Sequence, residues 1–319
     1  MSRRVNILFL GGAKRVSIGR MFIDAGRRLG LEVYLFSYEL ESHVPVSVIA
    51  EIIIGLRWRD PNLLKHLHDT VTAHSIDIII PFVDGAIEPA SLYCSTYGDA
   101  WTPSGDAETM KTLFDKAASA TLFESNSLPI PTTFNGNRTF PLIAKPRFGS
   151  ASRGIRIISS DKEFDEIAEN ITDYLIQEYI AQREEYTVDC YIDAHGTPIC
   201  TVPRKRLEVV GGEVSRTVTL RDDRIMELSR KVIDRLHLRG AVTLQFLRDI
   251  TTDRLLLMEI NPRLGGGAVC SVHAGADLPS FILSEWAGMS LTPCDNWRDG
   301  TEISRYQQEV VFYNNPNDK

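Results

Sequence analysis

The chain has 319 residues, of which 43% are hydrophobic and 24% charged, and its formal net charge is −7. This composition is that of an ordinary globular protein with a substantial core and room for more than one domain. The negative charge argues against a nucleic-acid partner, and no apolar run is long enough to span a membrane. Because the N-terminus leads directly into a strand pattern, we expect a cytoplasmic protein with no membrane partner.

The first hundred residues alternate between strand and helix patterns. The strand patterns cover residues 5–10, 32–37, 49–54 and 76–82, and the helical patterns cover residues 17–29 and 61–74. This alternation predicts a parallel, Rossmann-like βαβ domain over residues 1–104. Gly11 and Gly12 do not fit the G-x-G-x-x-G fingerprint, so nicotinamide binding is disfavoured. Asp84 follows the last strand, where ligand clefts open in α/β sheets, and is a candidate substrate contact.

A lysine and a loop of small residues follow a buried strand at residues 142–144. Lys145 stands at the lip of this strand, the loop covers residues 148–154, and a second strand follows at residues 155–158. Small residues let backbone N–H groups approach an anion closely, and the lysine adds a positive charge, which predicts a phosphate grip. It is not a P-loop, because here the lysine precedes the loop. A glycine–serine hairpin with a surface lysine is the alternative.

The rest of the chain mixes helices with antiparallel strands. One long helix is predicted for residues 107–125, with Ser104 or Asp106 as its cap and Lys116 in its interior. Further helices are predicted at residues 161–170, 223–237 and 278–287, and strands at residues 174–179, 184–193, 197–203, 213–220, 241–249 and 254–260. The fold class is therefore α/β followed by α+β.

The last two of these strands carry three oxygen-donating side chains. Glu259 and Asn261 are two positions apart and project to one side of an extended chain, and Gln245 can lie beside them on the neighbouring strand. One carboxylate and two amides suit Mg²⁺, which takes few protein ligands and completes its shell with water and phosphate oxygens. A strand end with surface polar residues is the alternative.

Two further features point to a substrate. A basic predicted hairpin carries Arg204 and Arg206, which suit a carboxylate or phosphate, with a solvated basic hairpin as the alternative. His273 follows the glycine cluster at residues 265–267 and is a candidate for the acceptor pocket.

Together, Lys145 with its loop, the segment LIQEYIAQREEYTVD, and LQF paired with MEINPR resemble the ATP-grasp superfamily. They look most like its carbamoyl-phosphate-synthetase-like branch and the single-domain carboxylate–amine ligases. The resemblance covers residues 104–267, and the preceding domain is similar to a pre-ATP-grasp domain. It implies a two-subdomain ATP-grasp fold with the nucleotide between a small subdomain at residues 105–184 and a C-terminal subdomain at residues 185–319.

The resemblance also assigns nucleotide contacts. It implies that Lys116 and Lys145 bind the phosphates and that Glu185 binds the ribose hydroxyls. Glu178 and the backbone of Tyr179 and Ile180 match the adenine hinge. The lid over the phosphates matches residues 150–154, including Ser150, Ser152 and Gly154. Many relatives have more glycines in this loop than the two found here, Gly149 and Gly154.

For the chemistry, Gln245, Glu259 and Asn261 match the Mg²⁺ positions, with Mn²⁺ as an alternative, and the expected catalytic residues are Arg263 and Lys145. The implied reaction uses ATP to turn a carboxylate into an acyl phosphate, which an amine then attacks. The implied partners are small carboxylate and amine molecules, and a homodimer is left open. An inactive nucleotide-binding regulatory module and a kinase on the same fold are the alternatives. Carbamoyl-phosphate synthesis is disfavoured, because the full enzyme resembles two such halves and this chain has room for one.

Overall fold

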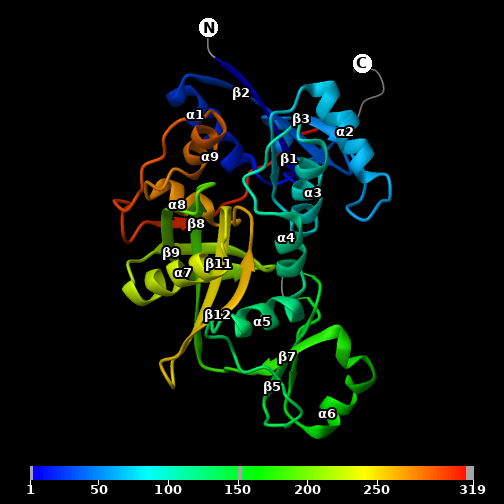
Figure 1. Cartoon of the computed structure of the whole chain (residues 1–319), viewed down its shortest axis with the longest axis vertical. Helices are drawn as coiled ribbons and strands as arrows, with labels where there is room; N and C mark the ends of the chain where they lie inside the picture. The colour runs from blue at the N-terminus through cyan, green and yellow to red at the C-terminus, as the bar shows by residue number, and fades with distance from the viewer. Residues whose placement is uncertain (1–2, 150–152, 314–319) are drawn as a thin grey trace. The chain divides into compact units, whose positions relative to one another are not determined.

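The computed structural model describes residues 3–149 and 153–313, which form two compact units (Figure 1). The first unit comprises Met1–Pro103, Asp277–Leu291 and Ser304–Lys319, and the second comprises Ser104–Ala276 and Thr292–Ile303. The subdivision of the second part at residue 184 stays a prediction. No helix in the described part of the chain is both long and apolar enough to cross a lipid bilayer.

Four parallel strands form the sheet of the first unit. Their order is β3 (Glu51–Ile54), β2 (Leu31–Glu39), β1 (Arg3–Leu10) and β4 (Ile78–Pro81). Residues 5–10 of β1 and all of β4 are buried, as expected for a parallel sheet with both faces covered. Each fully buried Leu or Ile of these strands contributes about 1.5–3 kcal/mol. The helices of this unit are α1 (Val16–Leu29), α2 (Leu63–His74), α3 (Ile87–Tyr97) and α9 (Leu278–Trp286), with 3₁₀ helices η1 (Pro45–Val48) and η2 (Asp84–Ala86).

Helix α9 is distant in sequence from the rest of the first unit and packs against α1. An Arg28 Nη2 donates to Asp277 Oδ2 at 2.5 Å, and the Arg3 guanidinium lies 4.1 Å from the centre of the Trp286 ring. The sequence predicts the helix but not its location, because its partners precede it by about 250 residues in the chain.

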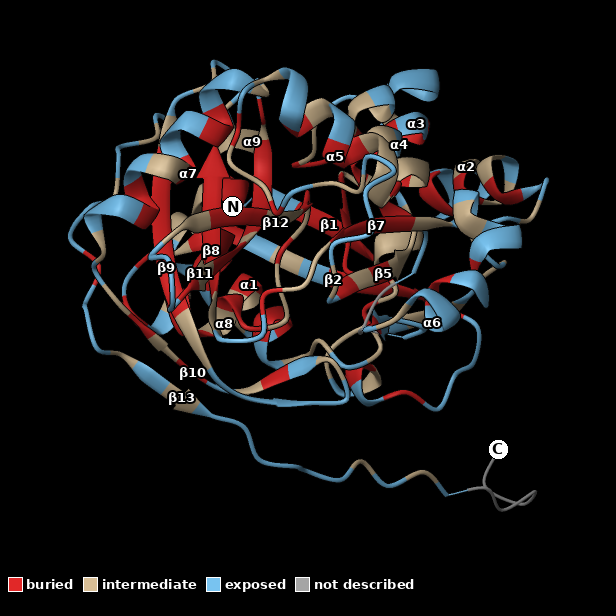
Figure 2. Ribbon diagram, turned by 90° about the horizontal axis from the view of Figure 1, so that it is seen from below, coloured by how far each residue is buried: buried red, intermediate tan, exposed pale blue. Residues whose placement is uncertain are grey.

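Six strands form the main sheet of the second unit. Their order is β12 (Leu255–Asn261), β11 (Gly240–Asp249), β8 (Arg183–Ile192), β9 (Pro198–Val210), β10 (Glu213–Thr219) and β13 (Glu302–Ser304). The pairs from β12 through to β10 are antiparallel, and residues 186–192 of β8 are buried (Figure 2). Helix α7 (Asp223–Arg235) packs against β9, and α8 (Ala268–His273) packs against β10.

A smaller antiparallel sheet has the order β6 (Arg156–Ile158), β5 (Leu142–Pro146) and β7 (Tyr174–Glu178). Leu142 and Ala144 of β5 belong to a core that also includes residues of α6 (Asp161–Asp165) and of the segment before η3 (Ala168–Asp173). Because side chains alternate along a strand, Ile143 and Lys145 project from the other face of this sheet. The sheet thus holds Lys145 away from its apolar core.

The predicted helix at residues 107–125 is wrong in one respect, since it is two helices. These are α4 (Ala107–Phe114) and α5 (Lys116–Ser125), and Asp115 between them has an extended backbone with φ −90° and ψ 109°. The Asp115 carboxylate caps α5 by accepting the N–H groups of Ala117 and Ala118 at 3.0 and 3.3 Å. Asp106 caps α4, one of the two caps predicted. Lys116 is therefore the first residue of a helix and not an interior one.

Candidate nucleotide and metal site

The strand register places most of the predicted ribose, metal and substrate residues on one face of the six-stranded sheet. Gln245 of β11 pairs with Glu259 of β12 and with Thr187 of β8, which confirms the predicted proximity of Gln245 and Glu259. Directly opposite residues of antiparallel strands project to the same side. We call this the polar face, and its members are Glu185, Thr187, Asp189, Arg204, Arg206, Thr243, Gln245, Glu259 and Asn261.

Lys145 is held by a side chain that the sequence analysis did not single out. Its ammonium donates to Gln177 Oε1 at 3.0 Å, and the buried Gln177 amide in turn donates to the Pro131 carbonyl at 3.1 Å. Gln177 pairs with Ile143, so it lies diagonally opposite Lys145 on the same face of the small sheet. The pairing of β5 with β7, which the sequence does not specify, is what identifies Gln177 as a partner of Lys145.

The electrostatic surroundings of Lys145 link it to the polar face. Burial lowers the pKa of Lys145 to about 8, and the positive charges of Lys116 and Arg183 act in the same direction. The carboxylates of Glu259 and Glu185 oppose this and favour the ammonium form. Lys145 is therefore within electrostatic range of the second predicted phosphate contact, Lys116, and of the carboxylates of Glu185 and Glu259.

Lys116 is tied to the predicted grip loop. Its ammonium donates to the Gly149 carbonyl at 2.6 Å, and its backbone N–H donates to the Arg147 carbonyl at 3.0 Å. The Arg147 guanidinium binds the Asp115 carboxylate in a two-pronged pair, with the Nε to Oδ1 distance 3.0 Å. Burial alone would raise the pKa of Asp115, but the bonds from Arg147 and from the start of α5 lower it.

The loop itself has two glycines with positive φ. These are Gly149 at +123° and Gly154 at +74°, conformations that residues with a side chain rarely adopt. Ser150 and Ser152, which the resemblance assigns to the lid, lie outside the described residues. Gly149 thus directly precedes the predicted lid at residues 150–154, and Gly154 is its last residue.

The Glu178 side chain is fully engaged by other parts of the second unit. Its two carboxylate oxygens accept from Arg254 Nη1 and Nη2 at 2.9 and 2.8 Å, and Oε1 also accepts the Thr132 N–H at 2.8 Å. The bond from Arg254 lowers the pKa of Glu178. In this arrangement Glu178 holds the predicted hinge in place. The Tyr179 N–H donates to the Pro141 carbonyl at 3.0 Å and the Ile180 carbonyl accepts from Arg183 Nη1 at 2.8 Å, and the contact of this backbone with adenine stays a prediction. The role of Arg254 gave no local sequence signal.

Glu185, the predicted ribose acid, lies between two arginines. Its Oε1 accepts from Arg183 Nε at 3.2 Å and its Oε2 accepts from Arg206 Nη1 at 3.1 Å. Arg206 is 16% exposed and lies beside a predicted nucleotide contact. Its candidacy as a substrate contact stays a prediction.

Arg204 has a different role from the predicted one. Its side chain is 1% exposed, and its Nε and Nη2 donate to the two oxygens of Asp189 at 2.7 and 3.1 Å. A guanidinium that is buried and already paired with a carboxylate is not available to a substrate. The basic run in the sequence gave no sign that Arg204 is covered and paired with Asp189, whereas Arg206, two positions on, stays partly exposed.

The predicted metal residues have suitable chemistry for a hard cation. Glu259 supplies a carboxylate, Gln245 and Asn261 supply amide oxygens, and all three project from neighbouring strands of the polar face. Within residues 3–149 and 153–313, no cluster of three or more His, Cys, Asp and Glu side chains is arranged to hold a metal ion. The carboxylate and amide oxygens at Glu259, Gln245 and Asn261 are donors that suit a hard cation such as Mg²⁺, with phosphate and water as its other ligands.

The three remaining predicted site residues are Arg263 and His273, which lie in the second unit, and Asp84, which lies in the first. The Arg263 N–H donates to the Asn261 carbonyl at 2.8 Å, so Arg263 directly follows the predicted metal residues. His273 is the exposed last residue of α8. Asp84 begins η2 after β4 and belongs to the first unit, and its contact with a substrate stays a prediction.

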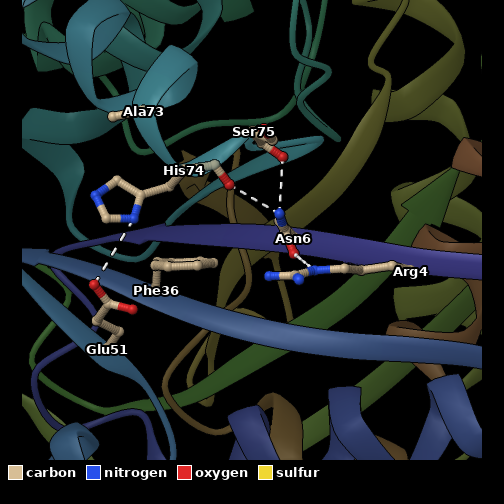
Figure 3. A pocket seen from close by; sticks show the side chains of 7 residues that line it. All are labelled: Arg4, Asn6, Phe36, Glu51, Ala73, His74 and Ser75. Atoms are coloured by element: carbon tan, nitrogen blue, oxygen red, sulfur yellow. Dashed lines mark hydrogen bonds and ion pairs between the residues drawn. The ribbon is translucent and has the colours of Figure 1, made fainter.

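A pocket of about 430 Å³ in the first unit contains none of the predicted site residues (Figure 3). It lies beside the beginnings of β1 and β3 and the end of α2. The Asn6 amide donates to the carbonyls of His74 and Ser75 at 2.8 and 3.0 Å, and Arg4 Nε donates to Asn6 Oδ1 at 2.8 Å. The polar groups shown in Figure 3 thus largely bind one another, and they join the strand ends to the helix.

Comparisons with known proteins agree with this geometry. A family model described as "ATP-grasp in the biosynthetic pathway with Ter operon" matches residues 170–309. The carbamoyl phosphate synthase large chain of Thermotoga neapolitana is 22% identical over 190 residues, which are 54% of this chain and 17% of that protein. The biotin carboxylase domain of 2-oxoglutarate carboxylase from Hydrogenobacter thermophilus, solved with MgADP, ADP and bicarbonate, has a TM-score of 0.77 at 18% identity, covering 93% of this chain and 73% of that one. The L-amino acid ligase of Bacillus licheniformis has a TM-score of 0.69 at 16% identity, and the match covers 90% of this chain and 75% of that one.

These findings define the fold as a mixed α/β fold of the ATP-grasp type. The chain is similar to ATP-grasp proteins in sequence and fold, which supports the resemblance drawn from the motifs, and the proteins it matches include a carbamoyl phosphate synthase as expected. The chain spans 17% of the length of this carbamoyl phosphate synthase and 26% of the length of another curated relative, the methylcrotonoyl-CoA carboxylase subunit alpha of Arabidopsis thaliana.

Proposed function

We propose that this protein is an ATP- and Mg²⁺-dependent, ADP-forming ligase that activates a carboxylate as an acyl phosphate for attack by an amine. The observation that carries the proposal is the polar face, where Gln245 lies directly opposite Glu259 and Asn261 follows on the same side. Lys145 lies within electrostatic range of Glu259, so phosphate and metal contacts can act on one nucleotide. The fold likeness to an L-amino acid ligase supports an amine as the second substrate.

In this proposal the nucleotide lies between the small subdomain and the C-terminal subdomain. Lys145 and Lys116 neutralise its phosphates, Glu185 binds its ribose, and the backbone at Tyr179 and Ile180 binds its adenine. Gly154 belongs to the lid over the phosphates. Residues 1–104 form the Rossmann-like pre-ATP-grasp domain, and the protein acts on small molecules in the cytoplasm.

Gln245, Glu259 and Asn261 would hold Mg²⁺, and Mn²⁺ fits the same donors. The ion supplies neutralisation of the charge on the phosphoryl oxygens. An oxygen of the substrate carboxylate attacks the γ-phosphorus, the bond to the β–γ bridging oxygen breaks, and ADP leaves with that electron pair. The amine then attacks the acyl carbon, inorganic phosphate leaves, and the nitrogen loses a proton. Arg263 holds the carboxylate and stabilises negative charge on the acyl phosphate.

Hydroxylamine trapping tests this proposal directly. The protein is mixed with MgATP, hydroxylamine and one carboxylic acid at a time from an amino-acid and small-acid library, and ADP and hydroxamate are measured together. We expect both products with the correct acid, because hydroxylamine intercepts an acyl phosphate. Arg263→Met should abolish the hydroxamate, whereas the control Arg224→Met, which removes an exposed arginine paired with Asp253, should not.

The alternatives give different results in the same assay. ADP formed with a hydroxyl acceptor and no hydroxamate from any acid would make the protein a kinase. Nucleotide binding without ADP formation under any condition would make it a nucleotide-binding regulatory module. Either result would contradict the ligase proposal.

A further inference from the structure

The second unit buries two opposite charges that no nucleotide contact explains. Arg204 is 1% exposed and Asp189 is 2% exposed, and two hydrogen bonds join them at 2.7 and 3.1 Å. Such a pair is weak evidence for stability, because removing both charges from water offsets much of their attraction. We therefore ask which segments of the chain the Arg204–Asp189 pair holds in place.

The pair connects four elements of the second unit. Ser271 of α8 donates to Asp189 Oδ2 at 2.5 Å, and Arg204 Nη1 donates to Thr217 Oγ1 of β10 at 3.2 Å. Asp189 lies on β8 and Arg204 lies on β9. All four side chains are buried, so few alternative partners are available to them.

The glycine cluster that follows Arg263 lies directly on this pair. A Cβ added at Gly267 would be 2.5 Å from Arg204 Nη1, and one added at Gly265 would be 3.3 Å from Asp189 Oδ1. Gly267 has φ −89°, which any residue can adopt, so the position requires small size and not an unusual backbone conformation. The backbone at residues 265–267 is therefore packed against the ion pair.

Both ends of this segment are also fixed. Thr243 Oγ1 donates to the Arg263 carbonyl at 2.9 Å, and Thr243 pairs with Asp189 on one side and with Asn261 on the other. At the other end, the bond from Ser271 to Asp189 anchors α8. The polar network thus holds the chain from Asn261, a predicted metal residue, through Arg263 to α8.

We propose that Arg204 is a positioning residue, which acts through the glycine segment to place Arg263 and Asn261 for phosphoryl transfer. The catalytic part of this inference rests on the ligase function proposed above, whereas the placement of the segment does not. Arg204 touches neither nucleotide nor acceptor in this assignment. Its loss should therefore reduce kcat and metal binding and leave the KM for ATP unchanged.

The test compares Arg204→Met and the double variant Arg204→Met/Asp189→Asn with the unaltered protein. The double variant removes both charges at similar volume, so its melting temperature should return towards that of the unaltered protein. We nevertheless expect its kcat and its Mn²⁺ affinity in the presence of ADP, measured by electron paramagnetic resonance, to fall by about 10- to 100-fold. The KM for ATP should change less than about twofold, since the nucleotide contacts remain. A double variant that recovers kcat and Mn²⁺ affinity together with thermal stability would overturn the proposal.

A pair of matched serine variants keeps the test decisive if the arginine variants do not fold. Ser271 and Ser229 are both 0% exposed and each donates one hydrogen bond, Ser271 to Asp189 and Ser229 to the Ile225 carbonyl within α7. Both alanine variants lose a buried hydroxyl bond. We expect only Ser271→Ala to lower kcat and Mn²⁺ affinity, and equal effects of the two variants would overturn the positioning role.

Amide hydrogen exchange separates this inference from the ligase proposal. If the unaltered protein forms no ADP with any acceptor, the ligase proposal fails, but exchange in peptides covering residues 263–271 can still be measured. We expect exchange there to be about tenfold faster in Ser271→Ala and unchanged in Ser229→Ala. Unchanged exchange in both variants would overturn the inference whatever the protein catalyses.

Discussion

At Lys145 two electrostatic effects oppose each other. Burial and nearby positive charges lower the pKa of its ammonium to about 8, and the carboxylates of Glu259 and Glu185 favour the charged form. A phosphate group bound at this position would add a strong preference for the ammonium. The protonation of Lys145 should therefore be coupled to nucleotide binding.

We expect ADP binding to take up a proton at Lys145 between about pH 8 and 10, because the free protein's low pKa rises towards its ordinary value on binding phosphate. ADP affinity should consequently weaken as the pH rises through 8. Calorimetry in EDTA, in two buffers of different ionisation enthalpy, measures this proton uptake without bound metal.

Two substitutions at this position provide the controls. Lys145→Arg keeps a charge that does not titrate in this range, so its binding should show no such proton uptake. Lys145→Met should lose about 10- to 100-fold in ADP affinity, since a charge-assisted hydrogen bond contributes about 1.5–3 kcal/mol. Unchanged affinity in Lys145→Met would contradict the phosphate contact.

At the scale of elements, the hinge after β7 depends on a bond to the turn before β12. Arg254 holds both carboxylate oxygens of Glu178, and the Tyr179 N–H donates to the Pro141 carbonyl at 3.0 Å. Because Arg254 lowers the pKa of Glu178, the ionised pair stabilises the fold. This contribution is present above the ordinary glutamate pKa near 4.5 and is lost as the pH falls through the lowered folded value.

We therefore expect Arg254→Met to lower the free energy of unfolding by about 1 kcal/mol at pH 7, a modest value because the pair is partly exposed. The difference from the unaltered protein should shrink as the pH falls from about 4.5 through the lowered pKa of Glu178, because the carboxylate then becomes protonated. Denaturant unfolding of both proteins at pH 7 and in acid measures this difference in the free energy of unfolding. In a Glu178→Gln background the effect of Arg254→Met should be smaller at pH 7, and an equal effect would show that Glu178 is not the relevant partner.

At the scale of the whole molecule, the proposed nucleotide contacts all belong to the second unit. Lys116, Lys145, Glu185 and Glu259 lie within Ser104–Ala276, whereas the glycine turn after β1 lies in the first unit. A nucleotide bound by the ATP-grasp residues and one bound by a dinucleotide fold would therefore protect different parts of the chain from exchange.

We expect MgADP to slow amide hydrogen exchange in β5, in the hinge after β7 and in β12, because binding stabilises the conformations that contact the ligand. Exchange mass spectrometry with and without MgADP tests this, with the nicotinamide dinucleotide as the comparison ligand. Protection by MgADP confined to the turn at Gly11 and Gly12 would contradict the site in the second unit.

The sequence alone determined the features that depend on neighbouring residues. Apolar runs and, in residues 187–192, alternating residues predicted strands, and Asp106 was one of two predicted caps. The spacing of Glu259 and Asn261 placed both on one side of a strand opposite Gln245. Several motifs in a fixed order predicted the ATP-grasp superfamily, because a shared site requires the same residue types at the same strand ends.

Only the tertiary structure decided which polar side chains are buried and what they bind. Arg204 and Arg206 are alternate residues of one basic strand and project to the same face, yet the first is fully buried with Asp189 and the second is partly exposed beside Glu185. Gln177 holds Lys145 from the neighbouring strand, and Arg254 holds Glu178 from the turn before β12. Helix α9 belongs to the first unit although the whole main segment of the second unit precedes it in the chain. Burial and ion pairing depend on residues far apart in the chain, which local periodicity does not encode, so these contacts required the folded structure.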